Sequence, residues 1–159
     1  MTTTLAFAFR AAMPADIDFE RVLYASTRDD LRPLGPEVFD GLIGMQFRAQ
    51  SMSLRLEHPQ ADRQIILVDD APAGRLVVDS VGAHVEVIDV ALLPEYRGNG
   101  VGTSVLRGVI SHADRLARSV RLHVEKQSRA VRLYERLGFT ITGDVGMYFA
   151  MSRHLASGF

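Results

Sequence analysis

The sequence of 159 residues contains no cysteine. This absence excludes disulfide bonds, thiolate nucleophiles, iron–sulfur clusters and zinc sites that depend on cysteine. The chain also has no surplus of one charge, because 18 Lys and Arg residues face 19 Asp and Glu residues, for a formal net charge of −1. A surface that binds nucleic acid through its phosphates needs clustered positive charge, so we expect no nucleic-acid partner.

Long apolar runs are missing as well. The most apolar stretch, residues 85–93, contains Glu86 and Asp89, and it is far shorter than the roughly 20 residues of a membrane-spanning helix. The first ten residues do not combine a basic start with a long apolar run, so we expect no secretory signal. The five histidines show no helical metal-ligand spacing, and no metal site is expected. These absences favour a cytoplasmic protein without a membrane partner.

The length suits one domain spanning residues 1–159, and apolar periodicity divides it into alternating elements. The predicted order is strand, two helices, three strands, helix, strand, helix and two strands. It mixes hairpins with strand–helix–strand crossovers, so we expect an α/β (α+β) fold, a mixed sheet of about seven strands with helices on both faces. The strands are expected at residues 5–10, 64–69, 75–79, 83–93, 120–124, 139–142 and 147–151, and the helices at 14–31, from 37 to before Pro59, at 101–117 and at 130–137.

The second predicted helix carries apolar residues at alternating spacings of four and three, which is typical of one buried helical face. We expect Met45, Met52 and Phe47 of this helix in the core. A turn at residues 70–74 is expected to join the second and third strands into a hairpin. The apolar face of the second predicted helix consists of Val38, Leu42, Met45, Ala49, Met52 and Leu56.

A glycine-rich loop between a strand and a helix is the most informative segment. Three glycines in five residues allow the backbone to approach a ligand closely, and the N–H groups at the start of a helix attract anions. A nucleotide-binding P-loop is excluded because no lysine follows the glycines, and a dinucleotide fingerprint fails at Thr103 and Val105. A tight turn without a ligand is the simpler alternative, but it needs only one glycine. The loop reads Arg97-Gly98-Asn99-Gly100-Val101-Gly102.

Two segments match motifs of a known family. Residues 92–102 contain the pattern [Q/R]-x-x-G-x-[G/A], and residues 130–139, AVRLYERLGF, contain the pattern A-x-x-L-Y-x-x-x-G-F. They resemble the acetyl-CoA loop and the second motif of the GCN5-related N-acetyltransferase superfamily. The resemblance implies a GNAT-like fold and an acetyl-CoA co-substrate. It departs from the family at Gln127 and Ser128, where the family often has asparagine. The cofactor-binding residues it implies are Ala91, Leu92, Leu93, Arg97, Gly98, Asn99, Gly100, Val101, Gly102, Thr103, Ser128 and Tyr134.

Acetyl transfer to an amine needs a base, a donor to the carbonyl oxygen and, for the departing thiolate, an acid. Glu86 falls where several family members carry a catalytic glutamate, whereas Asp89 lies closer to the thioester but on the opposite face of a regular strand. A bulge would change that parity. The base acts directly or through water. Tyr134 is the candidate acid by resemblance, and a backbone N–H near residues 90–92 is the candidate donor to the carbonyl oxygen.

The sequence therefore predicts an acetyl-CoA-dependent N-acetyltransferase that acts on a primary amine by direct attack in a ternary complex. A covalent acetyl-enzyme is not expected, because the chain lacks cysteine and an activated serine. The alternative is an acyl-CoA-binding protein or sensor without transfer activity. A homodimer is suggested by family analogy alone, and the acceptor stays open. Residues that could face an acceptor are Arg48, Gln50, Arg55, Glu57, Tyr148 and Phe149.

Overall fold

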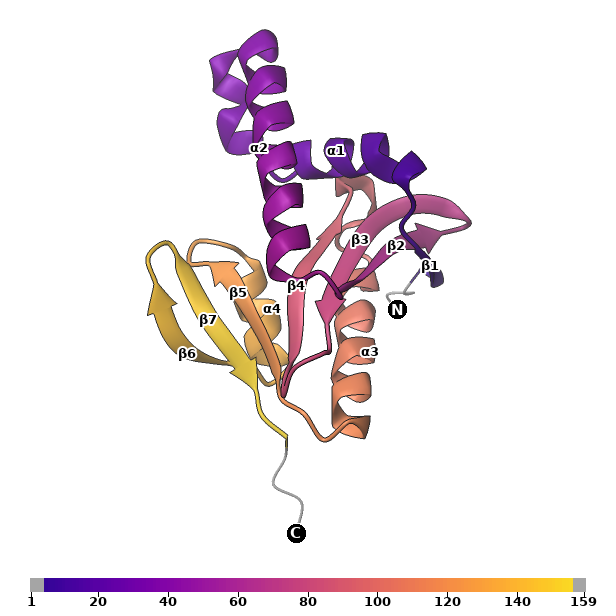
Figure 1. The fold of residues 1–159 in the computed structure, drawn as a ribbon, viewed down its shortest axis with the longest axis vertical. Coiled ribbons are helices and arrows are strands. Elements are labelled where there is room, and N and C mark those ends of the chain that lie inside the picture. Colours follow the sequence, from indigo (N-terminus) through magenta and orange to yellow (C-terminus); the bar gives the residue numbers. More distant parts are fainter. Residues whose placement is uncertain (1–4, 156–159) are drawn as a thin grey trace.

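The structure is a computed structural model that describes residues 5–155. Figure 1 shows a twisted sheet in the middle of the molecule, with helices packed against both of its faces. Within the described part of the chain, no helix combines the length and the apolar character that crossing a bilayer would take.

The sheet has seven strands in the order β1-β2-β3-β4-β5-β7-β6. β4 and β5 run parallel, and the other neighbouring pairs are antiparallel. The mixed sheet and the order of elements along the chain confirm the predicted α/β fold. The strands are β1 (Phe7–Ala11), β2 (Asp62–Val68), β3 (Ala71–Asp79), β4 (Val85–Leu92), β5 (Val120–Glu125), β6 (Thr140–Val145) and β7 (Tyr148–Arg153).

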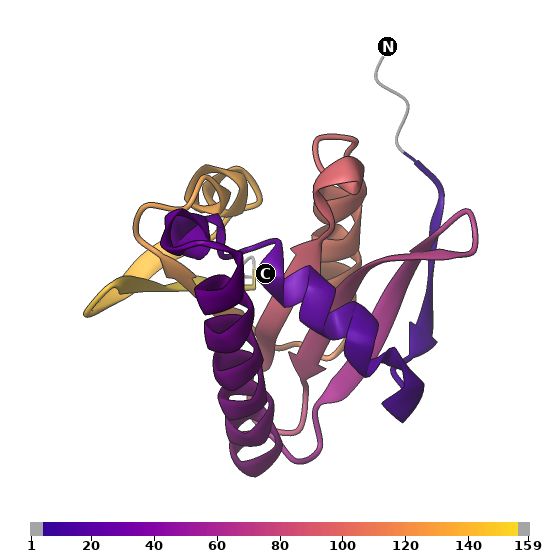
Figure 2. The same ribbon diagram turned by 90° about the horizontal axis from the view of Figure 1, so that it is seen from above.

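Two helices cover each face of the sheet. Figures 1 and 2 show α1 (Ile17–Ala25) and α2 (Pro36–Glu57) on one face, and α3 (Val101–Arg115) and α4 (Ala130–Arg136) on the other. A hydrophobic core lies between the sheet and α3, where aliphatic side chains of β2 to β5 meet those of the helix. Short 3₁₀ turns occupy Pro14–Asp16, Asp29–Leu34 and Pro94–Tyr96.

The first predicted helix, residues 14–31, is wrong in extent, because α1 ends at Ala25. Two hydroxyls end it. Ser26 Oγ donates to the Leu23 carbonyl at 2.6 Å, and Thr27 Oγ1 donates to the Tyr24 carbonyl at 2.7 Å. Such side-chain bonds offer the backbone an alternative to continuing the helix. The chain then forms the separate 3₁₀ turn that leads into α2.

The predicted buried face of α2 is also wrong. Val38, Met45, Met52 and Leu56 are 51%, 55%, 66% and 77% exposed, so Met45 and Met52 lie outside the core. The helix instead buries a neighbouring stripe that contains two aromatic rings, and the predicted core position of Phe47 is confirmed. Aromatic side chains bury more apolar area than aliphatic ones, which favours this rotation of the helix. The buried stripe consists of Phe39, Ile43, Gly44 and Phe47.

The turn between β2 and β3 is shorter than predicted. β3 begins at Ala71 rather than Arg75, and the turn consists of Asp69 and Asp70, which both have positive φ angles. Two such residues suit the tight turns whose twist matches paired strands. A register shift between Ile66 and Leu67 then accommodates the first residues of β3.

Candidate active site

The parallel strands β4 and β5 separate halfway along their length. Residues 85–87 pair with residues 120–122, and beyond these pairs the two strands continue to Leu92 and Glu125 without pairing with each other. On its other edge, β4 stays paired with β3 as far as Leu92. In the described chain, the end of β4 therefore has one backbone edge without a strand partner. The predicted cofactor-binding residues Ala91 and Leu92 lie on this segment, and Leu93 follows it.

A bulge in β4 decides which face its two carboxylates occupy. Val77 pairs with Asp89 and the next residue, Val78, pairs with Val87, so Ile88 is an extra residue in β4. An extra residue reverses the alternation of side chains beyond it. Val85 and Val87 before the bulge and Val90 and Leu92 after it accordingly all pack into the core beside α3. Glu86 and Asp89 consequently share the opposite face, which α1 and α2 cover.

Asp89 is engaged in a partly buried ion-pair network. Arg75 on β3 is 3% exposed and donates from Nε to Asp89 Oδ2 at 2.8 Å, with a second contact from Nη2 to the same oxygen. Its Nη1 donates to Glu20 Oε1 of α1 at 3.1 Å. Burial alone would lower the pKa of Arg75, but the charges and hydrogen bonds of Asp89 and Glu20 raise it. The network ties α1 to β3 and to the bulge of β4.

Glu86 lies in a different environment, since it lines a cavity of about 640 Å³. The C-terminal end of α2 forms one side of this cavity, and β5, β6 and β7 form the other. Glu86 makes no ion pair with any residue that the structure describes. The polar side chains that share the cavity with it are Glu57, His58, Arg121, His123, Thr142, Ser152 and His154.

Tyr134 of α4 reaches the core from the other face of the sheet. It is 7% exposed, and its ring packs against Phe139 with 5.7 Å between the ring centroids. Burial, together with the negative charge of Asp89, raises the pKa of its phenol from 10.0 to about 12. The phenol therefore keeps its proton at neutral pH and responds to the charge at the bulge of β4.

The glycine-rich loop forms the start of α3. Gly98 and Gly100 have φ angles of 78° and 80°, a left-handed conformation that glycine adopts without strain. Gly100 is the N-cap residue, and no side chain caps the helix. Among residues 5–155, no backbone acceptor pairs with the N–H groups of residues 98–103 outside the regular helix and strand bonds. These donors meet at the positive end of a helix of 15 residues, which suits a bound anion.

Arg97 anchors this loop to its surroundings. Its Nε donates to the Leu92 carbonyl at 2.9 Å, and its Nη2 lies 3.3 Å from both the carbonyl and the hydroxyl of Ser26. A substituent at Gly98 would point into open space, because no atom lies within 4 Å of a Cβ built there. The loop is thus held at the end of β4 with open space beside Gly98.

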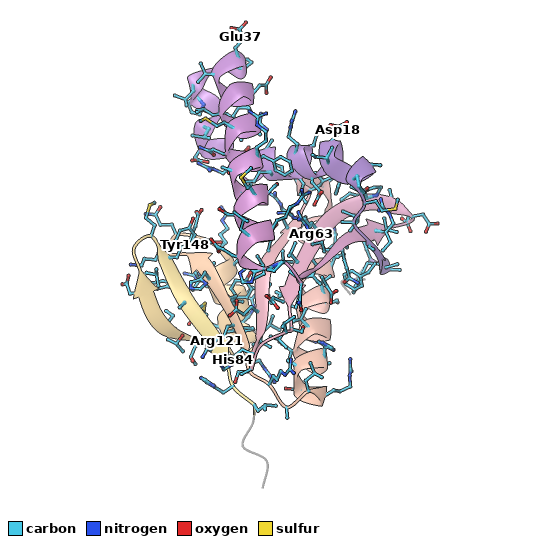
Figure 3. All side chains as sticks on the ribbon, viewed as in Figure 1. Asp18, Glu37, Arg63, His84, Arg121 and Tyr148 are labelled. Atoms are coloured by element: carbon cyan, nitrogen blue, oxygen red, sulfur yellow. The ribbon has the colours of Figure 1, made fainter. Side chains whose placement is uncertain are left out.

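Ser128 and the expected acceptor residues are dispersed. Ser128 Oγ accepts a hydrogen bond from the Ala130 N–H at 3.1 Å at the start of α4, so its oxygen already has a partner. Glu57 lines the cavity beside Glu86, whereas Arg48 and Arg55 line a different cavity, and Gln50 lines neither. Tyr148 and Phe149 line neither cavity. Figure 3 shows Tyr148 and Arg121 at opposite ends of the paired strands β5 and β7.

Two residues that shape the site went unnoticed in the sequence. Gly74 pairs with Leu92, and a Cβ at Gly74 would lie 2.2 Å from the Ala91 carbonyl oxygen, so β3 and β4 approach there as closely as only glycine permits. Arg75 follows it and holds Asp89. A glycine inside a strand signals close backbone approach, and a charged residue within the apolar run of β3 signals a buried partner.

Comparisons with known proteins agree with this geometry. A sequence model described as the acetyltransferase (GNAT) family matches residues 24–139, while no curated protein matches the chain. The solved structures similar to it include the PaiA N-acetyltransferase of Thermoplasma acidophilum in complex with coenzyme A, with a TM-score of 0.74, 15% identity and coverage of 95% of this chain and 100% of that one. Ard1 of Thermoplasma volcanium has a TM-score of 0.64 and 21% identity, covering 96% of this chain and 100% of its own.

A third similar structure is Naa50 of Arabidopsis thaliana in complex with the bisubstrate analogue CoA-Ac-MVNAL. Its TM-score is 0.61 at 16% identity, with coverage of 95% of this chain and 100% of that one. At these identities the solved structures show the shared fold, and the sequence model, which matches most of the chain, shows the family. The chain belongs to the GNAT family of acetyltransferases.

Proposed function

We propose that the chain is a single N-acetyltransferase domain that transfers the acetyl group of acetyl-CoA to a primary amine by direct attack in a ternary complex. The observation that carries this proposal is the run of N–H groups at residues 98–103, placed beside the unpaired edge of β4. Membership of the GNAT family supports it. So do the fold neighbours crystallised with coenzyme A or a CoA-containing analogue.

The residues present fit coenzyme A at two places. The N–H groups of Gly98, Asn99, Gly100, Val101, Gly102 and Thr103 would hold a diphosphate, which would neutralise the positive end of α3. The expected contact from the Arg97 N–H is not included, because this group donates to the Pro94 carbonyl at 3.2 Å. At residues 91–93, the backbone edge that faces away from β3 would pair with the amide-bearing arm, because an extended chain can add to an unpaired strand edge. The Leu93 N–H lies outside this edge, since it donates to the Ala73 carbonyl at 2.8 Å. Acetyl-CoA supplies a thioester carbonyl that an amine can attack.

Glu86 is the better candidate for the base. The Asp89 carboxylate already accepts hydrogen bonds from Nε and Nη2 of the buried Arg75, so it is committed to that ion pair. Glu86 instead faces a cavity that has room for an amine or a bridging water. We propose that the ion pair of Asp89 with Arg75 stabilises the bulge in β4. The bulge in turn sets the orientation of the end of β4 relative to Glu86.

Tyr134 would act on the departing thiolate as a hydrogen-bond donor. Its pKa of about 12 keeps the phenol protonated. A thiol has a reference pKa near 8.5, so complete proton transfer from Tyr134 to the thiolate would be uphill by roughly three to four pKa units. The phenol therefore stabilises the developing negative charge without giving up its proton.

The cavity beside Glu86 is the proposed entrance for the acceptor. Glu57 and Glu86 place two carboxylates along it, against the guanidinium of Arg121, and these carboxylates would attract an amine in its protonated form. Because an ammonium has no lone pair, it must lose a proton to Glu86, directly or through water, before it attacks.

Binding of acyl-CoA without transfer is the second candidate. Two observations favour it: Asp89 is neutralised by Arg75, and Ser128, which stands where the family often has asparagine, uses its oxygen to cap α4. The two candidates share the glycine-rich loop and differ only in turnover.

Two measurements test the proposal. Calorimetry gives the affinity for acetyl-CoA, and an assay of thioester consumption gives turnover with each of a panel of primary amines. Gly100→Glu adds a negatively charged side chain at the left-handed N-cap of α3. This charge should repel the diphosphate, so acetyl-CoA binding and turnover should both be lost. Gly146→Glu is the matched control, because Gly146 is also left-handed and has open space around it. Binding that persists in Gly100→Glu contradicts the cofactor site. Binding without product from any amine supports the second candidate.

A further inference from the structure

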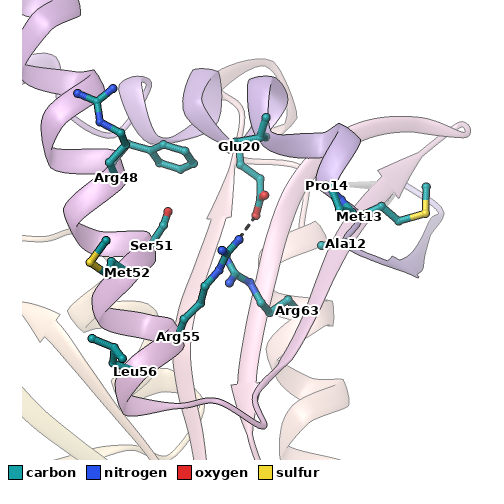
Figure 4. A pocket seen from close by; sticks show the side chains of 12 residues that line it. Ala12, Met13, Pro14, Glu20, Arg48, Ser51, Met52, Arg55, Leu56 and Arg63 are labelled. Atoms are coloured by element: carbon teal, nitrogen blue, oxygen red, sulfur yellow. Dashed lines mark ion pairs between the residues drawn. The ribbon is translucent and has the colours of Figure 1, made fainter.

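A second cavity, of about 660 Å³, lies on the other side of α2 from the cavity that contains Glu86. α1, α2, β2 and the segment between β1 and α1 line it, as Figure 4 shows. It shares no lining residue with the first cavity, and Glu86, Asp89, Tyr134 and the glycine-rich loop do not line it. Two of the residues expected to face an acceptor, Arg48 and Arg55, line this cavity instead of the one beside Glu86. A ligand held there would lie apart from Glu86 and from the glycine-rich loop.

Positive charge gathers in this cavity. In Figure 4, the guanidinium groups of Arg55 on α2 and Arg63 on β2 lie close together beside Glu20 of α1. Arg63 Nη2 is 4.0 Å from Glu20 Oε1, the same oxygen that accepts the bond from Arg75. Arg55 makes no ion pair with any described residue.

The network therefore contains three guanidinium groups, on Arg55, Arg63 and Arg75, and two carboxylates, on Glu20 and Asp89. Burial lowers the pKa of Arg63, and the positive charges of Arg75 and Arg55 lower it further, against the effect of Glu20. A further cation, Arg48, lines the same cavity, so positive charge exceeds negative charge there, and a bound anion would give the donors of Arg55 a partner.

Apolar side chains surround this charge. Phe47 is buried at the side of α2, and four exposed residues from three segments line the cavity. They include part of the α2 face that the sequence pattern had assigned to the core. Exposed apolar side chains gathered at one cavity are typical of a ligand site rather than of an ordinary surface. The four exposed residues are Met13, Ile17, Met52 and Leu56.

We propose that this cavity binds a small carboxylate that carries an aliphatic chain. The guanidinium of Arg55, with Arg63 beside it, would hold the carboxylate through charge-assisted hydrogen bonds. The chain would lie against Met52, Leu56 and Ile17. A singly charged carboxylate suits the site better than a doubly charged phosphate monoester, because the carboxylate of Glu20 in the same cavity would repel the second charge.

Calorimetric titration of octanoate into the full chain, without CoA or amine, tests this proposal. Because no acetyl transfer is involved, the result does not depend on that of the transfer assay. Octanoate should bind, and from butanoate to octanoate each added methylene should tighten binding about fourfold. Octylamine and octanol should bind at least about tenfold more weakly, because they cannot accept the arginine hydrogen bonds.

Two substitutions at exposed positions localise the site without disturbing the core. Arg55→Gln should weaken octanoate binding at least about tenfold, and Met52→Glu should abolish it by adding a negative charge. Arg21→Gln is the matched control, since Arg21 is an exposed arginine on α1 that does not line the cavity. The proposal is overturned if octanoate does not bind at millimolar concentration, if octylamine or octyl phosphate binds as tightly, or if Arg55→Gln binds like the wild type.

Discussion

Replacing Gly74 by alanine tests whether the close approach of β3 and β4 shapes the cofactor site. The added Cβ would lie 2.2 Å from the Ala91 carbonyl oxygen and 2.8 Å from Leu92 Cδ2, whereas ordinary contacts begin at 3.4 Å. The carbonyl would have to move by about 1 Å, because the β3 backbone cannot yield without breaking its pairing with β2. Such overpacking costs about 2–3 kcal/mol, which corresponds to a fall in melting temperature of roughly 5–10 °C for a chain of this size.

The functional effect should exceed the loss of stability. Ala91 and Leu92 form the edge proposed to pair with the arm of acetyl-CoA, so a shift of about 1 Å there should raise the Kd for acetyl-CoA at least about tenfold. Binding is measured by calorimetry at a temperature well below the melting point of the variant, so that both proteins are folded. Thermal unfolding followed by circular dichroism gives the stability.

Gly108→Ala is the matched control, because Gly108 lies inside α3 and has no atom within 4 Å of a Cβ built there. This substitution should stabilise the protein by about 0.5–1 kcal/mol through helix propensity and leave acetyl-CoA binding unchanged. If Gly74→Ala melts and binds acetyl-CoA like the wild type, the approach of β3 to Ala91 has no bearing on the cofactor site.

Three further predictions concern charged and titrating groups. Glu86→Gln should lower kcat at least about 100-fold and leave acetyl-CoA affinity unchanged in calorimetry, as expected of a general base; equal turnover would remove Glu86 from that role. Tyr134→Phe should lower kcat about tenfold, and because the pKa of Tyr134 is about 12, the shape of the pH–rate profile below that pH should not change. Hydrogen bonds from Arg10 lower the pKa of Asp16 from 3.8 to about 2. The stability that Asp16 contributes is therefore complete above its unfolded pKa and is lost as the pH falls from about 4 to 2. The melting temperatures of wild type and Asp16→Asn should converge over that range, and a constant difference would show that the ion pair does not stabilise the folded state.

Local sequence patterns were sufficient to predict the order of the secondary-structure elements and the position of the glycine-rich loop. Both depend on neighbours in the chain: alternation along a strand, helical spacing, and glycines at the start of a helix. The two positive φ angles at Gly98 and Gly100 agree with the conformational freedom that their lack of a side chain allows.

The α2 face shows where such patterns fail. Val38, Met45 and Met52 follow helical spacing as well as Phe39 and Phe47 do, and two apolar stripes then compete for one core. Spacing identifies each stripe but does not rank them. The packing of α2 against the sheet and α1 selects the stripe with the larger rings and leaves the other at the rim of a cavity.

The sequence by itself determined the family resemblance, the loop that suits a diphosphate and the two carboxylates of β4. Only the tertiary structure decided that Glu86 faces a cavity while Asp89 is paired with Arg75, because that outcome depends on an extra residue in β4 and on β3 beside it. A bulge changes which face a side chain occupies through pairing with another strand. That pairing is a contact between segments, and no local pattern of residues records it.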